Sequence, residues 1–132
     1  EISPRYAPAC EEMALLFERS DDLQEAVNWY NEALRANQFY SRAAIGLGRI
    51  SSSRGNPKCA QRAFESAADL APNWAEAQYQ AARWHFGEKS LFESARYCVR
   101  AVELDPEHSE ARAMMQELIT LFDDQAMVPG SQ

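Results

Sequence analysis

The chain has 132 residues, 46% of them hydrophobic and 25% charged, a composition typical of a folded domain and not of a disordered segment. Its formal net charge of −7, with no Lys/Arg cluster, argues against nucleic acid or an anionic membrane surface as a partner. No apolar run approaches the roughly 20 residues that span a bilayer, and no signal peptide is visible. We therefore expect neither a nucleic-acid partner nor a membrane partner.

Three cysteines, Cys10, Cys59 and Cys98, form no CxxC pair, which favours reduced thiols and a cytoplasmic or nuclear location. The sequence shows no clustered metal ligands, Gly-rich phosphate loop or nucleophile constellation. We expect no metal, no cofactor and no enzymatic activity. Because the chain begins at Glu1 without a methionine, we interpret it as a segment of a longer protein, whose targeting signals could lie outside it.

The first two predicted helices cover residues 7–19 and 22–36. Apolar residues recur in both at three- and four-residue steps, the spacing that places them on one helical face. The polar run Ser20-Asp21-Asp22 separates the two helices and offers side chains that can cap the start of the second. An antiparallel helix pair is the expected result.

The next two helices are predicted over residues 41–54 and 57–70. Gly55 is expected to end the first of them, and Pro57 to begin the second within its first turn. Gly48 lies inside the helical pattern, so it does not belong to a dinucleotide-binding loop. We expect this glycine to allow the two helices to approach closely.

Three further helices are predicted over residues 75–87, 91–104 and 107–122. Ser90 stands where the sixth helix begins, and Glu93 follows three residues later. This spacing is that of a capping box, in which each side chain would bond to the backbone N–H of the other residue.

A 34-residue period connects these helices. The segment Leu70-Ala71-Pro72-Asn73 recurs one period later as Leu104-Asp105-Pro106-Glu107. Four columns of mostly small or aromatic residues keep the same interval without an insertion: Ala14, Gly48 and Ala82; Ala26, Ala60 and Ser94; Tyr30, Phe64 and Cys98; Ala33, Ala67 and Ala101. Because one helix pair cannot bury its apolar face alone, the period predicts pairs stacked on one another.

At these positions the chain resembles the tetratricopeptide repeat (TPR) family, most closely in its second unit, at Leu47-Gly48, Ala60, Phe64, Ala67 and Pro72. The family's tryptophan and tyrosine columns are not kept, and hold Cys10, Ala44 and Gln78, and Phe17, Ser51 and His85. The resemblance implies an all-α, right-handed α-solenoid of three helix pairs closed by a C-terminal capping helix.

The implied organisation follows the period. It consists of an N-terminal extension over 1–6, repeats over 7–40, 41–74 and 75–108, a capping helix over 109–122 with a start near 107, and a flexible tail over 123–132. The resemblance further implies a protein–protein interaction scaffold whose first helices line a concave groove for a peptide or helix of a partner.

Carried over by register, the predicted peptide-binding residues are Arg42, Ile45, Arg49, Tyr79, Arg83 and Phe86. Arg49 and Arg83 share one register position, and paired guanidinium groups would suit an acidic or aromatic peptide. The alternative is that these arginines form ion pairs with Glu76, Glu110 or Glu117 on neighbouring helices.

Chaperone-binding members of the family hold a C-terminal carboxylate through a Lys/Asn/Asn/Lys/Arg constellation. The positions in register here are Glu11, Leu15, Gly46, Glu76 and Gln80, which supply no positive cradle. We therefore do not expect a carboxylate clamp for chaperone tails.

The last predicted helix is apolar over more than one stripe. A closing helix should turn a polar face to water, so we expect either ordinary capping or a partner or self-association surface, made of Met114, Met115, Leu118, Ile119 and Phe122. Two alternative functions therefore remain open: a self-assembly or intramolecular packing module, and an accessory domain of a multidomain enzyme.

Overall fold

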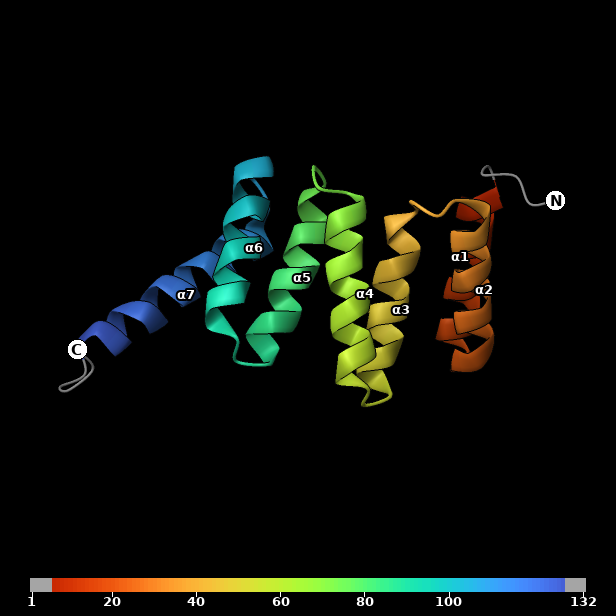
Figure 1. Cartoon of the computed structure of the whole chain (residues 1–132), viewed down its shortest axis with the longest axis horizontal. Helices are drawn as coiled ribbons and strands as arrows, with labels where there is room; N and C mark the ends of the chain where they lie inside the picture. Colours follow the sequence, from red (N-terminus) through yellow and green to blue (C-terminus); the bar gives the residue numbers. More distant parts are fainter. Residues whose placement is uncertain (1–5, 128–132) are drawn as a thin grey trace. The chain divides into compact units, whose positions relative to one another are not determined.

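A computed structural model describes residues 6–127, and the regular structure in that range is α-helical (Figure 1). The helices in chain order are α1 (Ala7–Arg19), α2 (Leu23–Ala36), α3 (Ser41–Ser53), α4 (Pro57–Leu70), α5 (Ala75–Gly87), α6 (Leu91–Leu104) and α7 (Ser109–Met127). The predicted all-α fold class is confirmed, and six of the seven helices lie within one residue of their predicted bounds.

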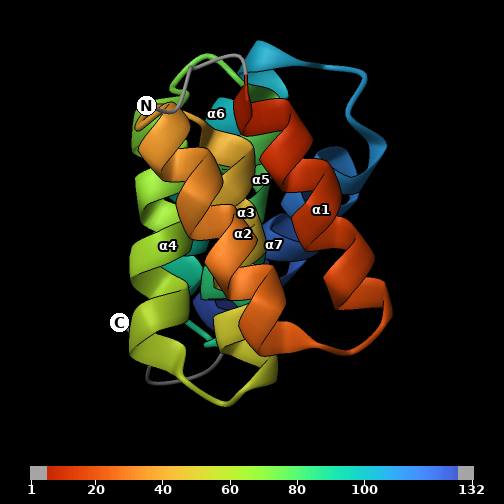
Figure 2. The same ribbon diagram turned by 90° about the vertical axis from the view of Figure 1, so that its right-hand side faces the viewer.

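The helices pack as the period predicts, in the pairs α1–α2, α3–α4 and α5–α6. Figure 2 shows α1 beside α2 and α3 beside α4. The chain divides into two compact units, residues 1–72 with α1 to α4 and residues 73–132 with α5 to α7. Within the first unit α2 also packs on α3, and within the second α6 packs on α7.

The same turn joins the two helices of every pair. A residue with positive φ follows each first helix at a 34-residue interval: Asp21 (62°), Gly55 (73°) and Lys89 (63°). The next amide donates to the carbonyl five residues earlier, at 2.9 Å in each turn, from Asp22 to Phe17, Asn56 to Ser51 and Ser90 to His85. This is a Schellman motif repeated three times, so the period governs the turns as well as the core.

The helix caps follow the sequence in part. Asp22 accepts a hydrogen bond from the Glu25 amide, and Asn56 accepts one from the Cys59 amide, each at 3.3 Å. The capping box predicted at Ser90 is wrong, because the Ser90 side chain makes no cap bond. Glu93 pairs instead with Arg96 at 2.7 Å, one helical turn further on.

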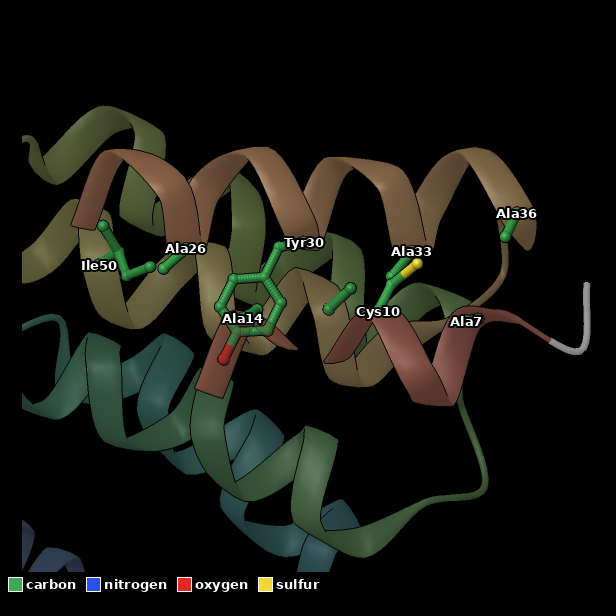
Figure 3. Packing of buried hydrophobic residues seen from close by; sticks show 9 residues of the cluster. Ala7, Cys10, Ala14, Ala26, Tyr30, Ala33, Ala36 and Ile50 are labelled. Carbon is green, nitrogen blue, oxygen red and sulfur yellow. The ribbon is translucent and has the colours of Figure 1, made fainter. Parts of the chain in front are cut away.

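Small residues bring the helices of the first unit together around Tyr30. Figure 3 shows this ring among the buried alanines of α1 and α2, with Ile50 of α3 close by. A Cβ atom added at Gly46 of α3 would lie 2.3 Å from the Tyr30 ring, and one at Gly48 would lie 2.9 Å from the Phe64 ring. The predicted close approach at Gly48 is confirmed, and Gly46 provides a second one.

The last helix differs from its predicted bounds. It begins at Ser109 and continues to Met127, so residues 123–127, which we expected in a flexible tail, are helical. Most of the predicted N-terminal extension (residues 1–5) and the end of that tail (residues 128–132) lie outside the described residues. Among the helices of residues 6–127, none is both long and apolar enough to cross a membrane.

Candidate functional site

The predicted peptide-binding residues lie on two first helices, one in each unit. Arg42, Ile45 and Arg49 follow one another along α3, and Tyr79, Arg83 and Phe86 along α5. The three arginines are exposed, and Phe86 is half-buried. Ile45 and Tyr79 are each only 8% exposed, so as apolar anchors they offer a partner little surface.

Arg49 is already engaged in a charged network. Its Nε and Nη2 atoms bind the Glu18 carboxylate of α1 at 3.1 and 2.8 Å, and Nη2 also donates to the Tyr30 hydroxyl at 3.1 Å. That hydroxyl in turn donates to Glu18 Oε1 at 2.5 Å. The ion-pair alternative therefore describes Arg49, although its partner is Glu18 and not one of the glutamates that we named. A ligand carboxylate would have to displace Glu18 to use this guanidinium.

The network sets the protonation states of its members. Burial alone would raise the pKa of Glu18, but the hydrogen bonds from Arg49 and Tyr30 and the charge of Arg49 lower it below its ordinary value. Burial and the adjacent Glu18 raise the pKa of Tyr30. At neutral pH Glu18 is therefore ionised and accepts hydrogen bonds, and the Tyr30 hydroxyl is protonated and donates one.

These protonation states predict an acid-sensitive contribution to stability. A lowered folded-state pKa stabilises the fold above the unfolded value near 4.5, and this contribution is lost as the pH falls through the folded value. We expect Glu18→Gln to lower the free energy of unfolding at neutral pH by about 1–2 kcal/mol and to flatten its decline on acidification. Urea unfolding between pH 7 and pH 3 measures both, with the exposed Glu12→Gln as the matched control. Parallel pH curves for wild type and Glu18→Gln would contradict the network.

Carboxylates with partners occupy two positions of the family's chaperone clamp. Glu11 accepts a hydrogen bond from the Tyr40 hydroxyl at 2.5 Å, and burial together with Glu11 raises the pKa of Tyr40 to about 12. Glu76 accepts bonds from Gln80 Nε2 at 2.6 Å and faces His108 Nε2 at 2.8 Å. Both glutamates therefore have a hydrogen-bond partner of their own.

Glu76, His108 and Glu110 place potential metal-ligand atoms within 4.8 Å of one another. The Ala111 amide donates to His108 Nδ1 at 3.1 Å, so the proton of the neutral ring resides on Nε2, facing Glu76. A metal at Nε2 would require the lone pair that this arrangement removes. His108 acts here as the N-cap of α7, a role that our sequence analysis missed.

The guanidinium of Arg83, unlike that of Arg49, is available to a ligand. It is exposed and forms no ion pair with any other residue in the range 6–127. Phe86 lies one turn further along α5 and is half-buried against the cluster of Ala82, Cys98 and Leu118. The α5 surface therefore combines an available guanidinium with the accessible part of an aromatic ring.

The predicted C-terminal surface separates into two faces of α7. Leu118 is only 3% exposed and packs on Ala82 and Cys98, so its assignment to a partner surface is wrong, and it serves ordinary capping. Met114, Met115 and Phe122 are half-buried at the edges of the same packing. Ile119, the next residue along, is 47% exposed and points away from the core.

Comparison with known proteins identifies the repeat. A family model for the tetratricopeptide repeat matches residues 7–40. No curated protein matches the sequence.

Solved structures show a similar fold at low identity. The first TPR of Spaghetti (RPAP3), bound to the HSP90 peptide SRMEEVD, is 16% identical over 92% of this chain and 97% of that one, with a TM-score of 0.79. The first TPR domain of human RPAP3 gives the same identity and TM-score over 96% and 100% of the two chains. The Yersinia enterocolitica type III secretion chaperone SycD, in complex with a peptide of the translocator YopD, is 16% identical over 89% of each chain, with a TM-score of 0.69.

Proposed function

Because residues 7–40 are a tetratricopeptide repeat and the chain has the fold of TPR domains, we propose that it is a non-catalytic scaffold that holds a peptide or helix of a partner protein. The proposal rests on Arg83 of α5, which is exposed and forms no ion pair within residues 6–127. Structures of similar fold hold peptides, an HSP90 peptide in RPAP3 and a translocator peptide in SycD.

The chemistry of α5 defines the ligand class. A guanidinium binds carboxylates through two parallel hydrogen bonds and stacks on aromatic rings. Phe86, one turn away, adds apolar contact area. A segment that presents an acidic or aromatic residue next to an apolar one fits this surface.

We do not expect chaperone tails of the kind bound by RPAP3 to be ligands of this chain, because of the charge at the clamp positions. The peptide SRMEEVD ends in acidic residues and a carboxylate. Glu11 in the first unit and Glu76 in the second each place a carboxylate at a clamp position in register, which is unfavourable for an acidic ligand, and their partners Tyr40 and His108 hold these carboxylates in place. Under this proposal SRMEEVD is a poor ligand for this chain.

A charge reversal tests the proposal. Peptides are selected from a random display library on the intact chain, and their affinities are measured by fluorescence anisotropy. We expect Arg83→Glu to weaken the selected peptides by about tenfold or more. Arg62→Glu, an equally exposed arginine on the second helix α4, should leave them unchanged.

The opposite pattern would refute the proposal. If Arg83→Glu and Arg62→Glu bind every selected peptide as wild type does, α5 does not carry recognition. If SRMEEVD binds more tightly than the selected peptides and loses affinity on acidification, the chain is a carboxylate clamp after all.

A further inference from the structure

The second unit has an apolar surface over α6 and α7, away from Arg83. Three adjoining hollows form it: one of about 390 Å³ on α6, one of about 190 Å³ between the helices, and one of about 450 Å³ along α7. Val99 lines the first two, and Met115 and Ile119 line the last two, so the hollows are neighbours. We call this the α6–α7 surface.

Large apolar side chains remain exposed on this surface. Phe92 is 78% exposed, Val99 44% and Ile119 47%. The packing of the pairs explains the exposure. Each of α1, α3 and α5 is covered by its own second helix, whereas in the described part of the chain α7 packs on α6 and has no such second helix. The bare side of α7 and the neighbouring side of α6 therefore form an apolar surface that no helix of the described residues covers.

The charged residues that line the hollows all have one sign. The three hollows are lined by Arg96, Arg100 and Arg112 and by no acidic residue, although the chain as a whole carries a net charge of −7. Arg96 pairs with the half-buried Glu93 at 2.7 Å, and Arg100 and Arg112 are exposed. A two-fold contact between two copies would bring both sets of arginines into one interface, which disfavours self-association here.

We propose that the α6–α7 surface binds an amphipathic helix of another polypeptide, with an apolar stripe bordered by acidic residues. The stripe would place anchors at positions i, i+3, i+4 and i+7 over Val99, Met115 and Ile119. Its acidic borders would meet Arg100 on one side and Arg112 on the other. This inference is independent of the peptide surface on α5, because the two share no residue.

The experiment uses a displayed library of amphipathic helices. Leucines are fixed at i, i+3, i+4 and i+7, and the flanking positions are randomised among Glu, Gln and Lys. The library is selected on the intact chain, on Ile119→Glu, and on the double variant Arg100→Glu/Arg112→Glu. All three substituted residues are exposed, and circular dichroism verifies that each variant is folded.

The proposal requires three results together. Helices selected on the wild type carry mostly Glu at the flanking positions, and helices selected on the double variant carry mostly Lys. Ile119→Glu binds the helices selected on the wild type about tenfold or more weakly than the wild type does. The proposal would be overturned if helices selected on the wild type showed no preference for Glu at the flanking positions. It would also be overturned if Ile119→Glu bound the selected helices as tightly as the wild type does. Light scattering that shows dimers abolished by Ile119→Glu would assign the surface to a second copy and would equally overturn it. Arg83→Glu should leave these helices bound, which separates this outcome from that of the proposed function.

Discussion

Gly46→Ala is expected to destabilise the chain by about 2–3 kcal/mol, although alanine is the better helix former. Helix propensity alone would make this substitution stabilising by about 1 kcal/mol. The added Cβ would lie 2.3 to 2.6 Å from three ring atoms of Tyr30, whose hydroxyl is held by Glu18 and Arg49. The ring cannot move without breaking the hydrogen bonds of its hydroxyl group. The cost of overpacking therefore exceeds the gain in helix propensity. Urea unfolding monitored by circular dichroism measures the sign.

Two variants make the result specific. Gly87→Ala lies in a helix with no atom near the added Cβ, and should be neutral or stabilising by about 0.5 kcal/mol. In a Tyr30→Ala background the cost of Gly46→Ala should largely disappear, because the clashing ring is gone. A gain of stability in Gly46→Ala equal to that in Gly87→Ala would show that α2 and α3 do not meet at this ring.

Leu118→Ala is expected to cost about 2–4 kcal/mol. The side chain is buried between Ala82 of α5 and Cys98 of α6, where its loss leaves a cavity. Proteolysis or hydrogen exchange should show α7 opening before the rest of the second unit. The adjacent Ile119→Ala removes a side chain of similar size from a half-exposed position and should cost less than about 1 kcal/mol. Equal losses in the two variants would contradict the orientation of α7.

The sequence predicts the helices well because their signals are local and repeated. Apolar spacing gives each helix, and the 34-residue period places its neighbour, so α1, α4, α5 and α6 have their predicted bounds. The end of α7 was missed because Asp123 and Asp124, which are poor helix formers, interrupt the apolar pattern after Phe122, although the helix continues to Met127. Of the two starts that we gave for this helix, 107 from apolar spacing and 109 from the period, the structure has Ser109, where a histidine performs the capping that Ser, Thr, Asp or Asn usually performs.

The candidate site is less predictable, because it depends on approaches between distant residues. Register places Arg49 correctly on a first helix. Its partner Glu18 is 31 residues away, and their meeting depends on how closely α3 approaches the first pair. The faces of α7 show the same difficulty. Leu118 and Ile119 are neighbours of equal hydrophobicity, and only the packing on α5 and α6 decides which of them is buried.

Photo-crosslinking to a bound peptide tests the central claim most directly, that partners bind on the first helices. A photoreactive amino acid replaces Gly87 on α5, which is exposed one turn after Arg83, or, as a control, Arg62 on α4. This design leaves Arg83 in place, and the chain is irradiated with a library-selected peptide. We predict a crosslink from position 87 and none from position 62. A crosslink from position 62 alone would place the partner on the second helices and contradict the account.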